Sequence, residues 1–162
     1  MNVLGLMLSF LLGSGLSVLP PSPYIDVGAC PFECCAYRDW RTERETTVFD
    51  KPGGRKIAKL NKGEWINALD GETHSIPLRV VATHEITEAG IHRGDTFYVL
   101  HYEGEFYWKI WYKGKTFDTE SGDPRFPKTT WWARVRQKNG SIGWVIASGG
   151  AFSNQDRCGS TI

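Results

Sequence analysis

The stretch TWWARVRQKNGSIGWVIAS, residues 130–148, decides the fold. From residue 131 to residue 136 every second side chain, beginning with the first tryptophan, is apolar, which is the period of a half-buried β-strand. Residues 138–140, Lys-Asn-Gly, supply a turn that tolerates positive φ, and residues 142–146 form a second short apolar run. The stretch therefore predicts a β-hairpin, in which Gly143 leaves room for a neighbouring backbone or ring.

The same stretch resembles the closing signature of bacterial SH3-like domains. That signature is a Trp-x-x-Val strand, a turn ending in Gly, and then Gly-Trp-Val; here the three parts stand at Trp132–Val135, Gly140 and Gly143–Val145. An opening signature lies upstream at residues 47–64, where an extended segment with a Pro-Gly turn precedes a strand that ends in Leu-x-x-Gly-Glu. The family needs few residues between the two halves, whereas residues 71–129 separate them in this chain.

The resemblance covers residues 47–148 and implies an all-β fold built on a small SH3-like β-barrel. It also implies recognition of peptidoglycan, of its peptides, or of a partner protein in the cell envelope. Loops beside the tryptophan strand border the ligand groove in such domains, so the loop at residues 118–128 is a candidate rim.

An internal repeat helps to explain the long insertion. Residues 62–69 align with residues 93–100, because each begins with a basic-Gly-acidic triplet and continues as a strand ending in Leu. Residues 108–115 resemble the closing strand in their spacing of tryptophan, a second aromatic residue and glycine. These patterns predict two packed or interleaved SH3-like units, and one barrel with a long decorated hairpin is the alternative. The predicted outer unit comprises residues 47–70 and 130–147, and the predicted inner unit residues 78–118.

The composition is that of a compact β-rich protein and argues against a nucleic-acid partner. Aromatic residues make up 13% of the 162 residues and include 7 Trp, which is a dense apolar supply for a small core. The 18 Gly and 8 Pro suit frequent turns. The 19 basic and 18 acidic side chains are spread along the chain and leave a net charge of +1, so no basic patch for a polyanion is visible.

Residues 1–19 predict a secretory signal peptide. They carry no charged side chain, and their apolar run is broken by Gly and Ser, short of the roughly 18 apolar residues of a usual membrane span. Two alternatives are an uncleaved membrane anchor and a lipid anchor on Cys30, although Cys30 lies far beyond the apolar run. We therefore expect an exported protein of the periplasm or cell envelope, with no stable membrane span after signal removal.

The four cysteines support export, because disulfides persist in oxidising compartments. Cys30, Cys34 and Cys35 crowd the N-terminal extension, and Cys158 lies in the C-terminal tail. A bridge between the adjacent Cys34 and Cys35 would be strained, so we expect Cys158 to pair with one of the first three and the other two to pair locally. Such bridges would clamp both termini onto the barrel. A zinc site is the alternative, although no Cys-x-x-Cys knuckle supports it. The extension comprises residues 20–46 and the tail residues 149–162.

Alternation separates core positions from candidate contact positions. If Ile66 and Ala68 face inward, Trp65 faces outward. Aromatic side chains occupy both faces of the segment 106–112, so either both faces are covered or one is a binding surface. One interpretation packs Trp65 and the two tryptophans of this segment between the units; the other is a groove for an extended peptide or a glycan-linked peptide. The predicted ligand contacts are Trp65, Tyr102, Trp111, Trp131 and Trp132.

No catalytic or metal-binding motif stands out, so we predict a noncatalytic protein without a cofactor or metal. The four histidines are scattered and form neither His-Glu-x-x-His nor His-x-Cys, and the chain has no Gly-x-Ser-x-Gly. Oxidised cysteines cannot act as thiol nucleophiles. A metal site at His84 and His92 is the weaker interpretation, because lone histidines on strands mostly pack or face solvent.

Together these features predict an exported, noncatalytic binding module that recognises peptidoglycan or its peptides through an aromatic groove. The alternative is a periplasmic interaction or inhibitor module that docks on an envelope enzyme. The two differ in ligand, since only the first binds wall material directly.

Overall fold

The computed structural model describes residues 18–104, 106–120 and 125–158, and within these ranges the protein is almost entirely β. This confirms the predicted all-β class. Of the predicted signal peptide, residues 1–17 lie outside the described residues. The elements are β1 (Tyr24–Val27), β2 (Asp39–Thr42), β3 (Thr46–Phe49), β4 (Lys56–Leu60), β5 (Trp65–Ile76), β6 (Leu78–Val81), the 3-10 turn η1 (Thr87–Ala89), β7 (Thr96–Gly104), β8 (Tyr107–Tyr112), β9 (Lys115–Thr119), β10 (Lys128–Arg136), β11 (Ile142–Ile146) and β12 (Phe152–Ser153).

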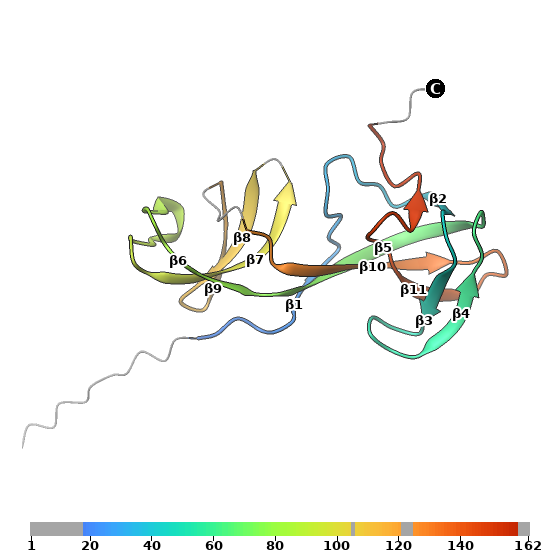
Figure 1. Cartoon of the computed structure of the whole chain (residues 1–162), viewed down its shortest axis with the longest axis horizontal. Coiled ribbons are helices and arrows are strands. Elements are labelled where there is room, and N and C mark those ends of the chain that lie inside the picture. Colours follow the sequence, from blue (N-terminus) through green and yellow to red (C-terminus); the bar gives the residue numbers. More distant parts are fainter. Residues whose placement is uncertain (1–17, 105, 121–124, 159–162) are drawn as a thin grey trace, which may run out of the picture.

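The strands form two sheets, which give the molecule two lobes (Figure 1). The first sheet has the order β12-β2-β5-β10-β11-β3-β4, with β1 added against β5, and we call it the first lobe. The second sheet is a meander of order β6-β7-β8-β9 and forms the second lobe. The segments predicted as an outer unit thus share one sheet, and those predicted as an inner unit share the other.

The hairpin predicted from the deciding stretch is present. β10 and β11 pair antiparallel around a turn in which Gly140 has a φ of +84°, a conformation that glycine adopts without strain. Gly143 is buried, and a Cβ atom there would lie 3.0 Å from the carbonyl oxygen of Phe49. Because Gly143 has no side chain, the β3 backbone can approach it closely, as expected.

Two long strands join the lobes. β5 has 12 residues and β10 has 9, and they pair with each other from Ile76 opposite Lys128 to Asn67 opposite Arg136. β5 continues through Pro77 into β6 of the second lobe, and the chain returns from β9 into β10 (Figure 1). The segment that separates the two signature halves is therefore an inserted sheet carried on one continuous ribbon.

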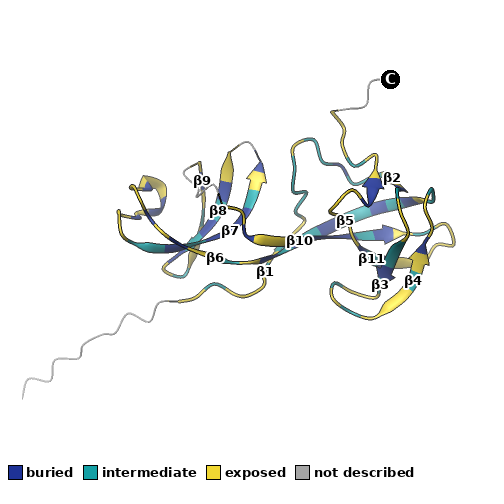
Figure 2. Ribbon diagram, viewed as in Figure 1, coloured by how far each residue is buried: buried dark blue, intermediate teal, exposed yellow. Residues whose placement is uncertain are grey.

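Each lobe has its own buried core (Figure 2). In the first lobe Trp40 and Trp131 belong to the apolar cluster, with ring centroids 5.4 Å apart. In the second lobe side chains from β6, β7 and β8 surround Ile110, which has no exposed surface. Burial alternates along β5 as predicted, since Ile66 is buried and Trp65 is 47% exposed.

Two disulfides link Cys30 to Cys35 and Cys34 to Cys158. This confirms that Cys158 pairs with one of the first three cysteines and that the other two pair locally. The Cys₄ zinc site and the lipid anchor on Cys30 are wrong, because all four thiols are consumed. The extension and the tail also share backbone hydrogen bonds, including one from the Arg157 N–H to the Cys34 carbonyl oxygen at 2.9 Å.

Candidate functional site

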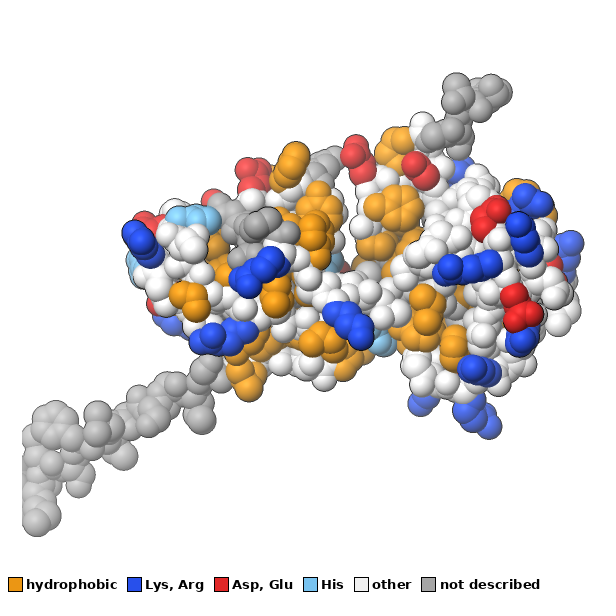
Figure 3. Space-filling view, viewed as in Figure 1, with side chains coloured by type: hydrophobic (Ala, Val, Ile, Leu, Met, Phe, Trp, Pro, Cys, Tyr) orange, Lys and Arg blue, Asp and Glu red, His pale blue; other side chains and the backbone are white. Residues whose placement is uncertain are grey.

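Two adjoining cavities open beside β10, one over the first lobe and one between the lobes. Their volumes are about 330 Å³ and about 270 Å³. Pro31 and Thr129 line both cavities, and we call the combined depression the seam groove. Figure 3 shows the cleft between the lobes, with hydrophobic side chains on both of its walls. Concave, mostly apolar sites of this size are typical of ligand pockets.

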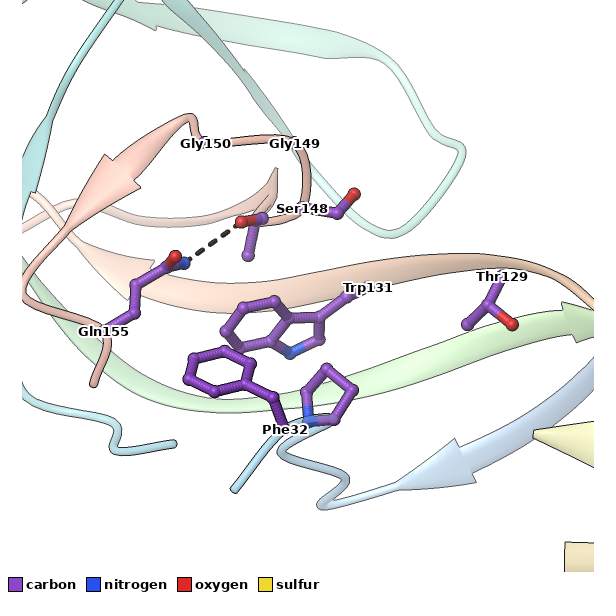
Figure 4. Close-up of a pocket in the computed structure, with 9 residues that line it drawn as sticks. Phe32, Thr129, Trp131, Ser148, Gly149, Gly150 and Gln155 are labelled. Carbon is purple, nitrogen blue, oxygen red and sulfur yellow. Dashed lines mark hydrogen bonds between the residues drawn. The ribbon is translucent and has the colours of Figure 1, made fainter. Parts of the chain in front are cut away.

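The first cavity lies over the indole of Trp131 (Figure 4). Phe32 stands edge-on to this ring, with centroids 5.7 Å apart and an interplanar angle of 82°. The rim turns at the glycines 149 and 150, whose φ angles are +72° and +69°. The Gln155 side-chain amide donates to the Ala147 carbonyl oxygen at 3.0 Å and braces this rim. The cavity is lined by Pro31, Phe32, Thr129, Trp131, Ala147, Ser148, Gly149, Gly150 and Gln155.

A chain of hydrogen bonds fixes the Trp131 ring. Its Nε1–H donates to the Tyr37 hydroxyl at 3.0 Å, and that hydroxyl donates to the Ala29 carbonyl oxygen at 2.5 Å. Burial raises the pKa of Tyr37, while the hydrogen bond from Trp131 opposes this shift. Trp131 is 4% exposed, so it forms a rigid wall rather than a mobile side chain.

An aromatic cluster forms one wall of the second cavity. Tyr102 and Trp108 have ring centroids 4.9 Å apart, and Phe126 lies 5.6 Å from the first and 4.9 Å from the second. Phe126 is nevertheless 66% exposed, so part of its ring is open to a ligand. Phe126 and Pro127 belong to the loop predicted as a rim, of which residues 121–124 lie outside the described residues. The cavity is lined by Pro31, Thr73, His101, Tyr102, Phe126, Pro127 and Thr129.

Polar atoms without a hydrogen-bond partner lie in the wall of this cavity or close to it. The side-chain oxygens of Thr73 and Ser75 and the Nε2 atom of His101 are buried, and among the described residues they find no hydrogen-bond partner. Nearly all buried polar atoms in proteins are hydrogen-bonded, because an unsatisfied one costs about 1–3 kcal/mol. Thr73 and His101 line the cavity directly, so a bound molecule can satisfy them.

A charged network borders the same region. Lys109 Nζ lies 2.6 Å from Glu103 Oε1 and 2.9 Å from Asp118 Oδ1. Burial alone lowers the pKa of Lys109, but the hydrogen bonds to Glu103 and Asp118 outweigh burial and raise that pKa above its usual range. Lys109 is therefore a cation at neutral pH. His101 Nε2 lies 2.8 Å from Asp26 Oδ2 at the inner end of this network.

Two of the five predicted contacts, Trp131 and Tyr102, line the seam groove. Trp132 lies on the other face of β10, where its ring stands edge-on to Phe49 with centroids 5.3 Å apart and is 7% exposed. The bulge in β10 falls between Arg134 and Val135, beyond the paired tryptophans. Regular alternation therefore turns Trp131, and not its neighbour, toward the groove.

Trp65 and Trp111 lie away from both cavities. Trp65 is half-exposed at the start of β5, and the Trp111 Nε1–H donates to the Val18 carbonyl oxygen at 2.7 Å. The interpretation that these rings and Trp108 pack between the two units is wrong, because Trp65 faces solvent and Trp108 belongs to the core of the second lobe.

Several groove residues were not predicted. Phe32 lies between Cys30 and Cys35, which form a disulfide. Its place between two cysteines could have indicated that it lies on a short, constrained loop near the core. Nothing in the local sequence indicated Thr73, since its role depends on the meeting of two sheets. His84 and His92, the weaker metal interpretation, are exposed, and His92 Nδ1 lies 3.6 Å from Glu85 Oε1.

Comparisons with protein-family models, with curated proteins and with solved structures find no match for this chain. The resemblance to bacterial SH3-like domains therefore stays a prediction.

Proposed function

We propose that the protein is a noncatalytic binding module whose seam groove holds a short extended peptide of peptidoglycan. The observation that carries the proposal is the first cavity, in which the fixed ring of Trp131 forms a wall beneath an open rim. Phe32 in this cavity and Phe126 in the next extend the aromatic surface along the groove. Rigid aromatic walls of this kind bind ligands at little entropic cost.

The polar floor supports a peptide rather than a purely apolar ligand. An extended peptide presents small side chains together with backbone N–H and C=O groups. The apolar first cavity suits a side chain, and the Thr73 hydroxyl, which both donates and accepts, suits a backbone group.

The predicted compartment agrees with such a ligand. Both disulfides favour a protein that folds in an oxidising environment, as exported proteins do. Among the described residues no helix is long and apolar enough to cross a bilayer. The resemblance to bacterial SH3-like domains adds peptidoglycan as the expected material, and a location in the periplasm or cell envelope is part of the proposal.

Cosedimentation of the oxidised protein with purified peptidoglycan, at low and high salt, tests this function. We expect binding that tolerates salt, because aromatic and hydrogen-bond contacts are screened less than surface charges. Phe126→Ala should weaken binding about tenfold, the effect of one aromatic contact worth about 1.4 kcal/mol. Trp65→Ala removes an exposed aromatic ring outside the groove and is the matched control. Equal sedimentation of the two variants would show that the groove does not hold the ligand.

A protein partner is the second candidate, and exposed aromatic residues favour it. Phe106 is 80% exposed and Phe126 is 66% exposed, an arrangement typical of contact surfaces. In this case the protein would not sediment with peptidoglycan at either salt concentration. Capture of an envelope enzyme by the wild-type protein, and its loss in Phe126→Ala, would then identify the interaction module.

A further inference from the structure

Behind the His101 wall of the second cavity, one histidine and two carboxylates come together from strands far apart in the sequence. Asp26 lies on β1, whereas His101 and Glu103 lie on β7. One ligand atom from each of the three lies within 4.8 Å of the other two. His101 is 4% exposed, while the side chains of Asp26 and Glu103 are 27% exposed, so the cluster is buried on one side and open to solvent on the other.

The tautomer of His101 can be assigned from its neighbours. Its Nδ1 atom lies 3.1 Å from the carbonyl oxygen of Tyr102, and a carbonyl oxygen only accepts hydrogen bonds. Nδ1 therefore carries a proton. In the neutral ring the lone pair is then on Nε2, and the nearest carboxylate oxygens belong to Asp26 at 2.8 Å and Glu103 at 3.8 Å. A lone pair this close to two anions is unfavourable unless a positive charge is present.

The position of the nearer carboxylate fits a shared ion better than a hydrogen bond. Nε2 and Asp26 Oδ2 are close, yet they do not meet the angular requirement of a hydrogen bond, and Nε2 has no such partner among the described residues. The two atoms, 2.8 Å apart, would subtend an angle of about 84° at a metal ion placed about 2.1 Å from each, close to the angle between adjacent octahedral ligands. An ion placed along the Nε2 lone pair would then have the Asp26 oxygen as an adjacent ligand.

We propose that Asp26, His101 and Glu103 bind a divalent transition-metal ion through one nitrogen and two carboxylate oxygens. Nitrogen and oxygen ligands without thiolate suit Zn²⁺, Mn²⁺ and related ions. The hydrogen bond from Nδ1–H to a backbone carbonyl is the outer contact that metal-binding histidines usually make, and it fixes the tautomer. The Tyr24 ring lies roughly parallel to the imidazole, with ring centroids 6.4 Å apart.

Lys109 explains how Glu103 is kept in place without an ion. Its ammonium group contacts Glu103 at 2.6 Å and Asp118 at 2.9 Å. When Glu103 turns toward the ion, Lys109 retains its contact with Asp118. Glu103 then pairs with the ion and Lys109 with Asp118, so every charged group keeps a partner of opposite charge. The ion can therefore bind and dissociate without disturbing the core of the second lobe.

Isothermal titration of the oxidised full chain with Zn²⁺ tests the site, and Co²⁺ absorption reports its coordination. We expect one ion per chain, with affinity reduced at least about 100-fold by Asp26→Asn and by Glu103→Gln. Both substitutions keep the side-chain shape at partly exposed positions, and urea unfolding checks that each variant folds. Glu85→Gln is the matched control, because Glu85 pairs with His92 on the exposed surface and, within the described part of the chain, no third candidate ligand joins them.

Two results would overturn the metal site. One is Zn²⁺ binding that is unchanged in Asp26→Asn and Glu103→Gln. The other is an absence of Zn²⁺ and Co²⁺ binding to the wild-type oxidised chain. Peptidoglycan cosedimentation is measured separately, so failure of the metal site is distinguishable from failure of the proposed binding function.

Discussion

The two disulfides should differ in what they contribute, and their loop lengths give the size of the difference. Cys34 and Cys158 are 124 residues apart, whereas Cys30 and Cys35 are 5 apart. In the chain-entropy model, closing the long loop stabilises the folded state by about 5 kcal/mol and closing the short loop by about 2 kcal/mol. Removing the long-range bridge therefore takes away much of the roughly 5–15 kcal/mol that stabilises an ordinary domain.

The test compares Cys34→Ala/Cys158→Ala with Cys30→Ala/Cys35→Ala in urea, followed by tryptophan fluorescence. We expect the free energy of unfolding to fall about 3 kcal/mol further in the first variant than in the second. Equal losses, or a larger loss from the short bridge, would refute the entropic reasoning. They would mean that packing of the clamped segments, rather than constraint of the unfolded chain, determines stability.

The same pair of variants should show the opposite order in ligand binding. The Cys30–Cys35 loop contains Pro31 and Phe32, which line the seam groove. Opening that loop frees Phe32 from its edge-on contact with Trp131. At low temperature, with both variants folded, peptidoglycan cosedimentation should fall more in the short-loop variant. A fall confined to the long-range variant would place the ligand elsewhere.

Three further outcomes follow from single contacts. Gly71→Ala should lower the free energy of unfolding by about 1–3 kcal/mol in urea, because its Cβ would overlap the Tyr37 hydroxyl and lie 2.5 Å from the Trp132 carbonyl oxygen. The free energy of unfolding, measured from pH 8 to pH 11, should fall above about pH 10. The pKa of Tyr37 is raised in the folded protein, so the Tyr37 hydroxyl loses its proton at lower pH in the unfolded chain than in the folded one. Tyr37→Phe should make this fall less steep. Trp65→Ala should change the free energy of unfolding by less than about 1 kcal/mol because the ring is half-exposed, and a larger loss by the same assay would mean that it packs more tightly than its exposure indicates.

Local patterns predicted those parts of the fold that depend on one or two strands. The β10–β11 hairpin, the inward and outward faces of β5 and the close approach at Gly143 all follow from period-two alternation and turn chemistry. Covalent geometry excluded a bridge between the adjacent Cys34 and Cys35, so the sequence predicted that Cys158 pairs within the N-terminal group but not which cysteine it pairs with. Each of these inferences requires only residues that are neighbours in sequence or across one turn.

The environment of the paired tryptophans could not be predicted in the same way. Alternation placed Trp131 and Trp132 on opposite faces, but it could not say what covers each face. The extension supplies Phe32 and Tyr37 on one side, and β3 supplies Phe49 on the other. Both rings are consequently almost fully buried, and Trp131 contributes a wall to the groove rather than a free surface.

The polar end of the groove depends on three strands meeting, which explains why no sequence motif indicated it. On β5, Thr73 stands opposite Asp26 of β1 and opposite Trp131 of β10, so a polar and an aromatic wall share one face of the ribbon. His101 reaches this face from the second lobe, and its Nε2 atom has no hydrogen-bond partner among the described residues. Neither copy of the internal repeat, residues 62–69 or residues 93–100, contains Asp26, Thr73 or His101. The insertion between β5 and β10 therefore does more than lengthen the chain: it brings His101 against the Asp26 carboxylate of the first lobe and into the same cavity as the Thr73 hydroxyl.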